Sequence, residues 1–246
     1  MPEKPRITVV DDYDAMSKLA ADRVADVITA FPDAAITVPT GSSPAGMYKE
    51  LVRRITSGEL DASKTQIFCL DDYLGQTPED EASLTKLLLR DFLVPAGIPM
   101  ENVHLIPTVT DDPHAAAEQY EASIAAAGGL KLAVIGLGLN GHVAFNEPGS
   151  GPDTRTRVVD LTRESRDQNA AYYEGAEVPE HAITMGIGTM LDAENIVMIV
   201  SGEAKADIVG EMVNGPRTND LPGSWIGEAG ERAELIVDKA AAAKIV

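Results

Sequence analysis

The repeating structural unit of this chain is found in the stretch Ala35-Ile36-Thr37-Val38-Pro39-Thr40-Gly41-Ser42-Ser43-Pro44-Ala45-Gly46. Residues 35–38 form a short run without charges, which is typical of a strand buried on both faces. From residue 44 to residue 57 the apolar side chains recur at helical spacing, and Pro44 suits the first turn of a helix. The stretch therefore predicts a strand, a tight glycine- and serine-containing loop, and a helix.

The same unit recurs through the chain on both sides of this stretch. Uncharged apolar runs predict strands, and amphipathic stretches between them predict helices. The predicted strands are 7–10, 35–38, 66–70, 132–136 and 196–200, with weaker candidates at 182–185 and 234–237 and edge strands at 103–106 and 157–161. The predicted helices are 14–31, 44–57, 82–93, 114–127 and 205–213. This alternation predicts an α/β fold with a doubly wound, mostly parallel sheet and helices on both faces, Rossmann-like, in a single domain spanning 1–246.

The composition of the chain excludes some kinds of binding partner. The formal net charge is −19 at pH 7, so nucleic acid phosphates and anionic membrane surfaces would repel the chain. No apolar stretch approaches the length of a transmembrane helix, and residues 1–6 do not resemble a secretory leader. The one cysteine, Cys69, lies in an apolar run and is interpreted as a buried hydrophobe. We therefore expect a cytoplasmic protein that binds neither nucleic acid nor membrane.

The loop after residues 35–38 is a candidate anion site. Gly41 allows the backbone to approach a ligand closely, and the hydroxyls of Ser42 and Ser43 lie where a helix begins. Free N–H groups at such a position bind phosphate. The alternative is an ordinary capped helix without a ligand.

Two adjacent carboxylates, Asp71 and Asp72, follow the predicted strand 66–70. Neighbouring side chains at the end of a strand diverge, so one carboxylate can face the crevice while the other braces the loop. A crevice carboxylate is a candidate base for proton transfer. A helix cap or a solvated acidic loop is the alternative.

A glycine-rich loop with a histidine follows the predicted strand 132–136. His142 lies there, and Glu147 follows five residues later, so the carboxylate is expected to raise the pKa of the imidazole and fix its tautomer. The glycine spacing fits a dinucleotide motif only in part, so we predict no organic cofactor. The other histidines, His104, His114 and His181, are interpreted as structural or exposed, and no metal site is predicted.

Three segments together resemble one enzyme family. They are Pro39-Thr40-Gly41-Ser42-Ser43-Pro44, Leu70-Asp71-Asp72-Tyr73 and Asn140-Gly141-His142-Val143-Ala144-Phe145-Asn146-Glu147-Pro148-Gly149, and Ser201-Gly202-Glu203-Ala204-Lys205 is a weaker match. In this order they resemble the glucosamine-6-phosphate deaminase/isomerase family, whose superfamily also contains 6-phosphogluconolactonases. The resemblance covers about residues 35–210.

The resemblance implies a role for each matching residue. Asp71 would move a proton between C2 and C1 of the opened sugar, and His142 would shuttle the proton at the ring oxygen. Glu147 and Asn140 would orient the imidazole. Gly41, Ser42 and Ser43 with Lys205 would hold the 6-phosphate. The full substrate- and phosphate-binding set would be Thr40, Gly41, Ser42, Ser43, Asp72 and Lys205, with Asp72 in a supporting position. The substrate would be a phosphorylated amino sugar, most simply glucosamine 6-phosphate converted to fructose 6-phosphate and ammonia, and homo-oligomers are possible.

The chain also departs from the family's pattern. Asn140 and Ala171 stand where the deaminases usually carry Asp and a phosphate-binding Arg, for which Arg163 or Arg166 would be neighbouring substitutes. Val159 replaces a basic residue linked to allosteric control. The segment Asn140-Gly141-His142 and the segment 222–225 also resemble a galactosamine-6-phosphate branch. The alternatives left open are that substrate, a lactonase-like hydrolase and a non-catalytic sugar-phosphate sensor.

Overall fold

The central sheet confirms the predicted parallel α/β fold. The computed structural model describes residues 5–163, 166 and 177–245, and within them seven strands lie in the order β1-β10-β9-β6-β2-β3-β5. Every neighbouring pair is parallel. The strands are β1 (Arg6–Val10), β2 (Ala35–Val38), β3 (Gln66–Cys69), β5 (Val103–His104), β6 (Leu132–Ile135), β9 (Asn195–Val200) and β10 (Ala233–Asp238).

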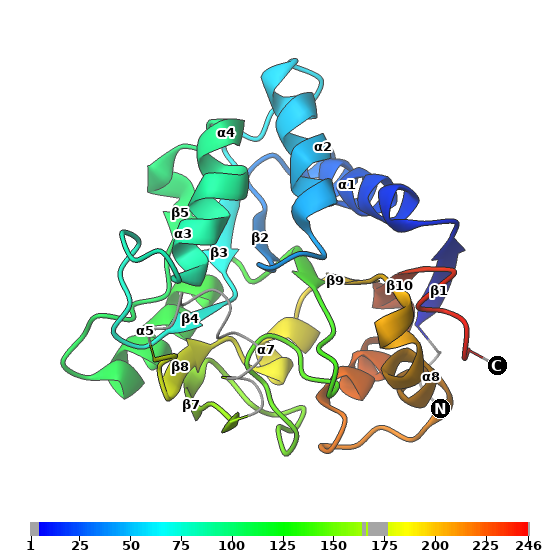
Figure 1. Ribbon diagram of the computed structural model, residues 1–246. Coiled ribbons are helices and arrows are strands. Elements are labelled where there is room, and N and C mark those ends of the chain that lie inside the picture. Colours follow the sequence, from blue (N-terminus) through cyan, green and yellow to red (C-terminus); the bar gives the residue numbers. More distant parts are fainter. Residues whose placement is uncertain (1–4, 164–165, 167–176, 246) are drawn as a thin grey trace.

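Helices cover both faces of this sheet, as the sequence predicts. Figure 1 shows α1, α2 and α4 above the strands and α7 and α8 below them. The helices are α1 (Tyr13–Ala30), α2 (Ala45–Thr56), α3 (Leu84–Leu88), α4 (Val94–Ala96), α5 (Pro113–Ala126), α7 (Ile187–Leu191) and α8 (Ala206–Asn214). Shorter turns are the π-helical η1 (Leu89–Leu93) and the 3-10 segments η2 (Met100–Asn102), η4 (Glu203–Lys205) and η5 (Pro222–Arg232). None of the described helices combines the length and the apolar character needed to cross a membrane.

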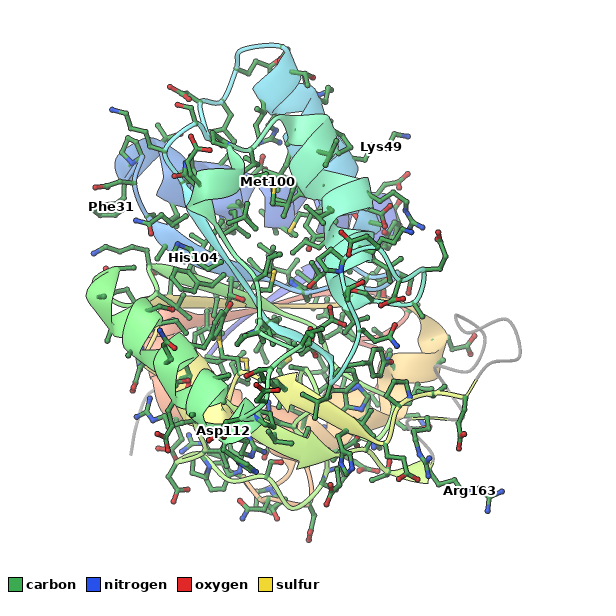
Figure 2. The ribbon with its side chains drawn as sticks, turned by 90° about the vertical axis from the view of Figure 1, so that its left-hand side faces the viewer. Phe31, Lys49, Met100, His104, Asp112 and Arg163 are labelled. Atoms are coloured by element: carbon green, nitrogen blue, oxygen red, sulfur yellow. The ribbon has the colours of Figure 1, made fainter. Side chains whose placement is uncertain are left out.

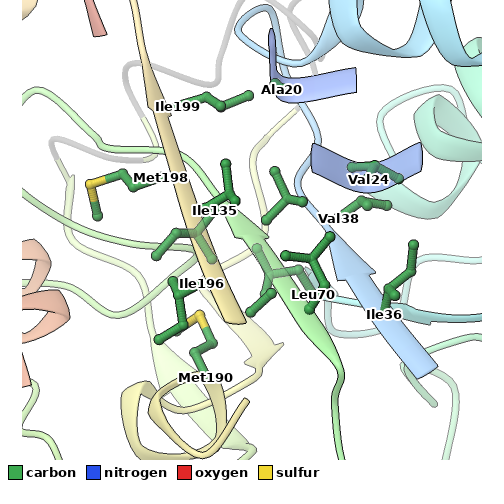
Figure 3. Packing of buried hydrophobic residues seen from close by; sticks show 14 of the residues in the cluster. Ala20, Val24, Ile36, Val38, Leu70, Ile135, Met190, Ile196, Met198 and Ile199 are labelled. Atoms are coloured by element: carbon green, nitrogen blue, oxygen red, sulfur yellow. The ribbon is translucent and has the colours of Figure 1, made fainter. Parts of the chain in front are cut away.

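The core explains why the strand sequences do not alternate. Figure 3 shows Ile199 of β9 beside Ala20 of α1, whereas Ile196 lies beside Met190 of α7 on the other side. Both faces of the strand are therefore covered by helices, and residues 196–200 are all buried. Cys69 is 2% exposed within the same cluster, which confirms its interpretation as a packing residue. Burial also raises the pKa of its thiol to about 12, so the thiol is protonated.

A second, smaller sheet corrects part of the prediction. β4 (Asp71–Tyr73), β8 (His181–Thr184) and β7 (Arg157–Asp160) form three antiparallel strands, although residues 71–73 are expected to be a loop. Asp71 pairs with Thr184, and the carbonyl of Leu70 accepts from the N–H of Met185 at 2.9 Å. Long-range pairing overrides the low strand propensity of the two aspartates. The chain thus passes from the large sheet to the small one at the acidic pair.

Candidate active site

Four neighbouring strands of the large sheet carry the predicted site residues. In the order β9-β6-β2-β3, the segments after their carboxyl ends contain Lys205, His142, residues 40–43 and Asp71. Parallel strands bring those ends to one edge of the sheet, where ligands bind in such folds. A cavity of about 440 Å³ lies there, a volume suited to a small molecule. Its wall is formed by Pro39, Thr40, Gly41, Ser42, Ser43, Pro44, Leu70, Asp71, Tyr73, Leu84, Leu87, Gly136, Leu137, Gly138, Leu139, His142, Ala144, Phe145, Ala204 and Lys205.

The loop from residue 39 to residue 44, here called the β2–α2 loop, presents free N–H groups at the cavity. Gly41 has φ +99°, a conformation that glycine adopts without strain. The N–H groups of Gly41, Ser42 and Ser43 donate to no other described residue. Exposed N–H groups next to the start of α2, together with two hydroxyls, have the chemistry of a phosphate site. The loop therefore has the donors that the sequence predicts.

Lys205 adds a positive charge to this cavity. Its Nζ donates to the carbonyl of Leu137 at 2.6 Å, which ties η4 to the loop after β6. Burial lowers the pKa of the ammonium, because desolvation disfavours its charged form. A bound phosphate would offset that penalty, so Lys205 is placed to contact an anion.

Asp71 is a buried carboxylate without a hydrogen-bond donor. It is 7% exposed, and no donor among the described residues contacts its oxygens. Burial, and secondly the charge of Asp72, raise the pKa of Asp71 to about 8. A carboxylate kept unpaired in a cavity has the properties of a proton-transfer base.

Asp72 has the opposite environment and does not line the cavity. Its carboxylate accepts from the hydroxyl of Ser83 at 2.7 Å and from the N–H groups of Tyr73, Leu84 and Thr85 at 2.8, 2.9 and 3.0 Å. Three of these donors belong to the start of α3. This is the capping or bracing role expected for one carboxylate of the pair, and it fits a supporting position for Asp72. A direct contact with the phosphate is not part of that role, because the side chain is fully occupied as a helix cap.

His142, Asn140 and Glu147 form a hydrogen-bonded chain that leads away from the cavity. The Asn140 Oδ1 lies 2.7 Å from Nδ1 of His142 and accepts from the backbone N–H of His142 at 3.1 Å. Asn140 Nδ2 donates to Glu147 Oε2 at 2.9 Å. Because the amide oxygen can only accept, Nδ1 carries the proton and Nε2 is left as the basic nitrogen.

Burial outweighs the charge of Glu147 at His142. Burial is the largest effect and lowers the pKa of the imidazole, the carboxylate of Glu147 raises it as the sequence predicts, and Lys205 lowers it further. The net shift in the pKa of His142 is therefore downward. Glu147 Oε2 is 3.9 Å from Nδ1, with the neutral Asn140 between them, so its charge acts at a distance.

The loop around residue 144 is held rigidly beneath the cavity. Ala144 has φ +54°, a left-handed conformation that is costly for a side chain with a Cβ atom. Asn146 Nδ2 donates to the carbonyls of Val143 and Met185 at 2.9 and 2.8 Å, and Arg157 Nη1 donates to Asn146 Oδ1 at 2.8 Å. Arg157 therefore braces the loop that carries Glu147.

Several lining residues were not identified from the sequence. Leu84 and Leu87 come from α3, and their spacing resembles that of any core-facing helix, so no signal distinguishes them. Tyr73 and Phe145 lie within the recognised motifs, and that membership is a signal that could have identified them as lining residues.

The arginines offered as substitutes for a missing phosphate ligand lie elsewhere. Figure 2 shows Arg163 extending outward from the edge of the molecule. Arg166 pairs with Glu180 at 3.2 Å. Neither lines the cavity, and Ala171 lies outside the described residues.

None of the remaining histidines lines the cavity. His104 stacks on Phe68 with ring centroids 4.0 Å apart, and His181 pairs with Asp160 at 2.9 Å. His114 lies in the first turn of α5. Within the ranges that the structure describes, no three His, Cys, Asp or Glu side chains are grouped so as to hold a metal ion.

Comparisons with known proteins agree with this geometry. A family model described as glucosamine-6-phosphate isomerases/6-phosphogluconolactonase matches residues 11–236. The glucosamine-6-phosphate deaminases of Streptomyces avermitilis and Clostridioides difficile are 38% and 39% identical over 241 residues, covering 97% and 98% of this chain and 92% and 96% of theirs.

The solved structures extend the likeness to three dimensions. A monomeric glucosamine-6-phosphate deaminase superposes with a TM-score of 0.92 at 30% identity, over 97% of this chain and 99% of that one. A 6-phosphogluconolactonase from Trypanosoma cruzi shares the fold, with a TM-score of 0.82 at 17% identity over 100% and 98% of the two chains. The chain therefore belongs to the glucosamine-6-phosphate isomerase/6-phosphogluconolactonase family.

Proposed function

We propose that this protein is an amino-sugar-6-phosphate deaminase/isomerase, converting glucosamine 6-phosphate and water to fructose 6-phosphate and ammonia. One observation carries the proposal: Asp71, His142, Lys205 and the β2–α2 loop line a single cavity. The names of relatives up to about 40% identical agree with it. In this arrangement the phosphate is held at one end of the cavity while acid–base groups act at the other.

The first step is the opening of the sugar ring. Nε2 of His142 accepts the proton of the anomeric hydroxyl and returns it to the ring oxygen, so that the C1–O5 bond breaks and an aldehyde forms. The transient imidazolium is stabilised by the carboxylate of Glu147 through Asn140. Asn140 fixes the tautomer that this step requires.

The second step is proton transfer between carbons. In the open chain the C2 proton is adjacent to the aldehyde and is therefore acidic. The Asp71 carboxylate removes it while the carbonyl oxygen O1 takes up a proton, which gives an enolamine with a C1–C2 double bond. The Asp71 carboxyl then delivers its proton to C1 and the nitrogen releases one proton, equal in number to the proton taken up by O1. C1 is left as a hydroxymethyl group and C2 as an imine. Water then adds to the imine carbon, and the C2–N bond breaks to give the ketone and ammonia. The phosphate site holds the reacting carbons in place without touching them.

The direct test is an ammonia-release assay with the purified protein. We expect turnover of glucosamine 6-phosphate, with formation of fructose 6-phosphate in equal amount. Release of no ammonia from either glucosamine or galactosamine 6-phosphate would rule the proposal out. The ratio of kcat/KM for these two C4 epimers also tests the galactosamine branch to which Asn140-Gly141-His142 bears a resemblance.

Two rival functions predict different results in the same assays. A 6-phosphogluconolactonase-like hydrolase would use His142 without Asp71, so Asp71→Asn would leave hydrolysis of the lactone intact. A sensor would bind the phosphosugar tightly without turnover. Asn140 and Ala171 are the departures that favour the sensor.

We further propose that the protein works in the cytoplasm on a phosphorylated amino sugar and does not bind nucleic acid. The charge of a sugar phosphate prevents it from crossing a membrane unaided, so such a substrate is confined to the compartment in which it is made. We also propose that the chain can form a homo-oligomer in solution. Light scattering of the purified chain gives its mass in solution, and the solved relative described above is named as a monomer.

A further inference from the structure

Two tyrosine hydroxyls hold the two ends of the β2–α2 loop. At its start, the hydroxyl of Tyr48 in α2 donates to the carbonyl of Pro39. At its end, the hydroxyl of Tyr13 in α1 donates to the carbonyl of Ser42 at 3.0 Å and accepts from the N–H of Gly46 at 2.8 Å. The segment between these two attachments is the part that lines the cavity.

Tyr13 supplies what the start of α2 lacks. The residue before this helix is Pro44, whose own side chain makes no capping hydrogen bond. The Tyr13 hydroxyl accepts the N–H of Gly46, and its own proton is bonded to Ser42. Because one hydroxyl both donates and accepts, it links the peptide of Ser42 to the first turn of the helix.

The position of Tyr13 is itself fixed. It is the first residue of α1, directly after Asp12, whose carboxylate caps the helix by accepting from the N–H of Ala15 at 2.9 Å. α1 and α2 pack so closely that a Cβ on Gly46 would lie 2.3 Å from the hydroxyl of Ser17. Figure 1 shows the two helices lying next to each other over the sheet. Tyr13 thus attaches the loop to a rigid pair of helices.

We propose that Tyr13 is a positioning residue for phosphate binding, whose hydroxyl holds the Ser42 peptide so that the free N–H groups of residues 41–43 converge on one anion. A loop containing Gly41 is otherwise free to rotate, and ordering it on binding would reduce affinity. The inference rests on the proposed function for the identity of the phosphosugar. The binding of phosphate itself can be measured separately.

The test compares Tyr13→Phe with a matched control. Tyr120→Phe also removes a hydroxyl with two hydrogen bonds, to the carbonyls of Cys69 and His104 at 2.8 and 3.0 Å, and neither partner belongs to the β2–α2 loop. Tyr120 does not line the cavity. Calorimetric titration with inorganic phosphate should give a dissociation constant roughly fivefold higher for Tyr13→Phe, the factor that one net hydrogen bond represents. Tyr120→Phe should leave the phosphate constant unchanged while lowering the melting temperature.

Kinetics provide a second readout that a merely structural role would not produce. For Tyr13→Phe, KM for the sugar phosphate should rise by a similar factor while kcat stays within about twofold, because the loop contacts only the phosphate. Unphosphorylated glucosamine should be handled equally by wild type and variant.

The outcomes separate the two proposals. The inference is overturned if Tyr13→Phe leaves both the phosphate constant and KM unchanged, or if Tyr120→Phe weakens phosphate binding equally. It is also overturned if the wild-type chain binds no phosphate. Phosphate binding that depends on Tyr13, without any ammonia release by the wild type, would support this inference and contradict the proposed function alone.

Discussion

Asp71 and Asp72 are neighbours in sequence with opposite environments. Successive side chains of a strand point to opposite faces, so β4 sends one carboxylate into the cavity and the other toward α3. Asp72 accepts four hydrogen bonds, whereas Asp71 is buried and accepts none from the residues that the structure describes. The charged form of Asp71 therefore weakens the fold, because burial has removed water and none of those residues supplies a donor in its place.

Replacing Asp71 with Asn should abolish catalysis and stabilise the protein. We expect ammonia release to fall by about 10³-fold or more, because the base that moves the C2 proton is gone. The folded pKa of about 8 lies above the ordinary aspartate value of 3.8, so between these two pH values the unfolded chain releases a proton that the folded chain keeps. Wild type should therefore lose stability relative to the variant as pH rises from about 4 to 8, by on the order of a few kcal/mol. Melting curves from pH 5 to pH 9 measure this, and parallel curves for the two proteins would contradict it.

The activity of the wild type should rise with pH. Asp71 must be ionised to accept a proton, and its pKa of about 8 places the ascending limb of kcat/KM near that pH. His142 is needed as the neutral base, and its lowered pKa means that it loses its proton at lower pH. A pH–rate profile from pH 5 to pH 9 tests this assignment, which an ascending limb near pH 5 would refute.

Glu147→Gln removes a charge but keeps the hydrogen bond to Asn140. Without the carboxylate, the pKa of His142 should fall further below its usual value, and kcat should fall about 10- to 100-fold because the imidazolium is less stabilised. The ring signals of His142 in an NMR titration report the change directly. The ring of His181, which pairs with Asp160, serves as the internal reference. An unchanged His142 titration would mean that Glu147 acts only through geometry.

At the scale of elements, Asp72 connects the small sheet to the lining of the cavity. It caps α3, and α3 carries Leu84 and Leu87 on the cavity wall. Loss of the cap should therefore affect substrate binding as well as stability.

Asp72→Ala should destabilise the fold by about 2 to 4 kcal/mol and raise KM severalfold, because several buried donors lose their partner and α3 loosens. The matched control is Asp112→Ala, which removes the N-cap of α5; Asp112 does not line the cavity. That variant should lose about 1 kcal/mol with KM unchanged. Chemical denaturation and steady-state kinetics distinguish the two, and an equal KM for both variants would count against a connection through α3.

A helix or strand can be predicted from the sequence when its own residues carry the pattern, and not when it depends on distant residues. Residues 132–136 form an uninterrupted apolar run. Such a run predicts a buried parallel strand, because a strand covered by helices on both faces has apolar side chains on both sides. β4 was missed because its two acidic residues become a strand only by pairing with β8, more than one hundred positions later in the sequence. α7, with Gly188 inside and Gly186 at its start, is too short to show a helical period. The motifs of the site are also local sequence patterns and can be recognised from the sequence. Leu84, Leu87 and Tyr13 carry no such pattern, because the tertiary structure alone brings them to the cavity or to its loop.

At the scale of the whole molecule, one hydrophobic cluster includes residues from Met16 in α1 to Ala241 after β10. Our interpretation of residues 1–246 as one domain predicts a single cooperative unfolding transition. Calorimetric and van't Hoff enthalpies should agree, and the transitions seen by fluorescence and circular dichroism should coincide. Two separated transitions would instead show that the small sheet of β4, β8 and β7 unfolds independently.

The strand order has a consequence for assembly of the native state. The segments proposed to bind a phosphosugar follow four strands that are contiguous in space but dispersed along the polypeptide, with β6 and β9 synthesised long after β2. A truncated polypeptide that ends before β9 lacks part of the proposed binding site. The ligand is therefore expected to bind only after β9 has joined the sheet. Binding of a phosphosugar would therefore stabilise only the completely folded protein. A ligand present during synthesis would increase the share of chains that reach this state.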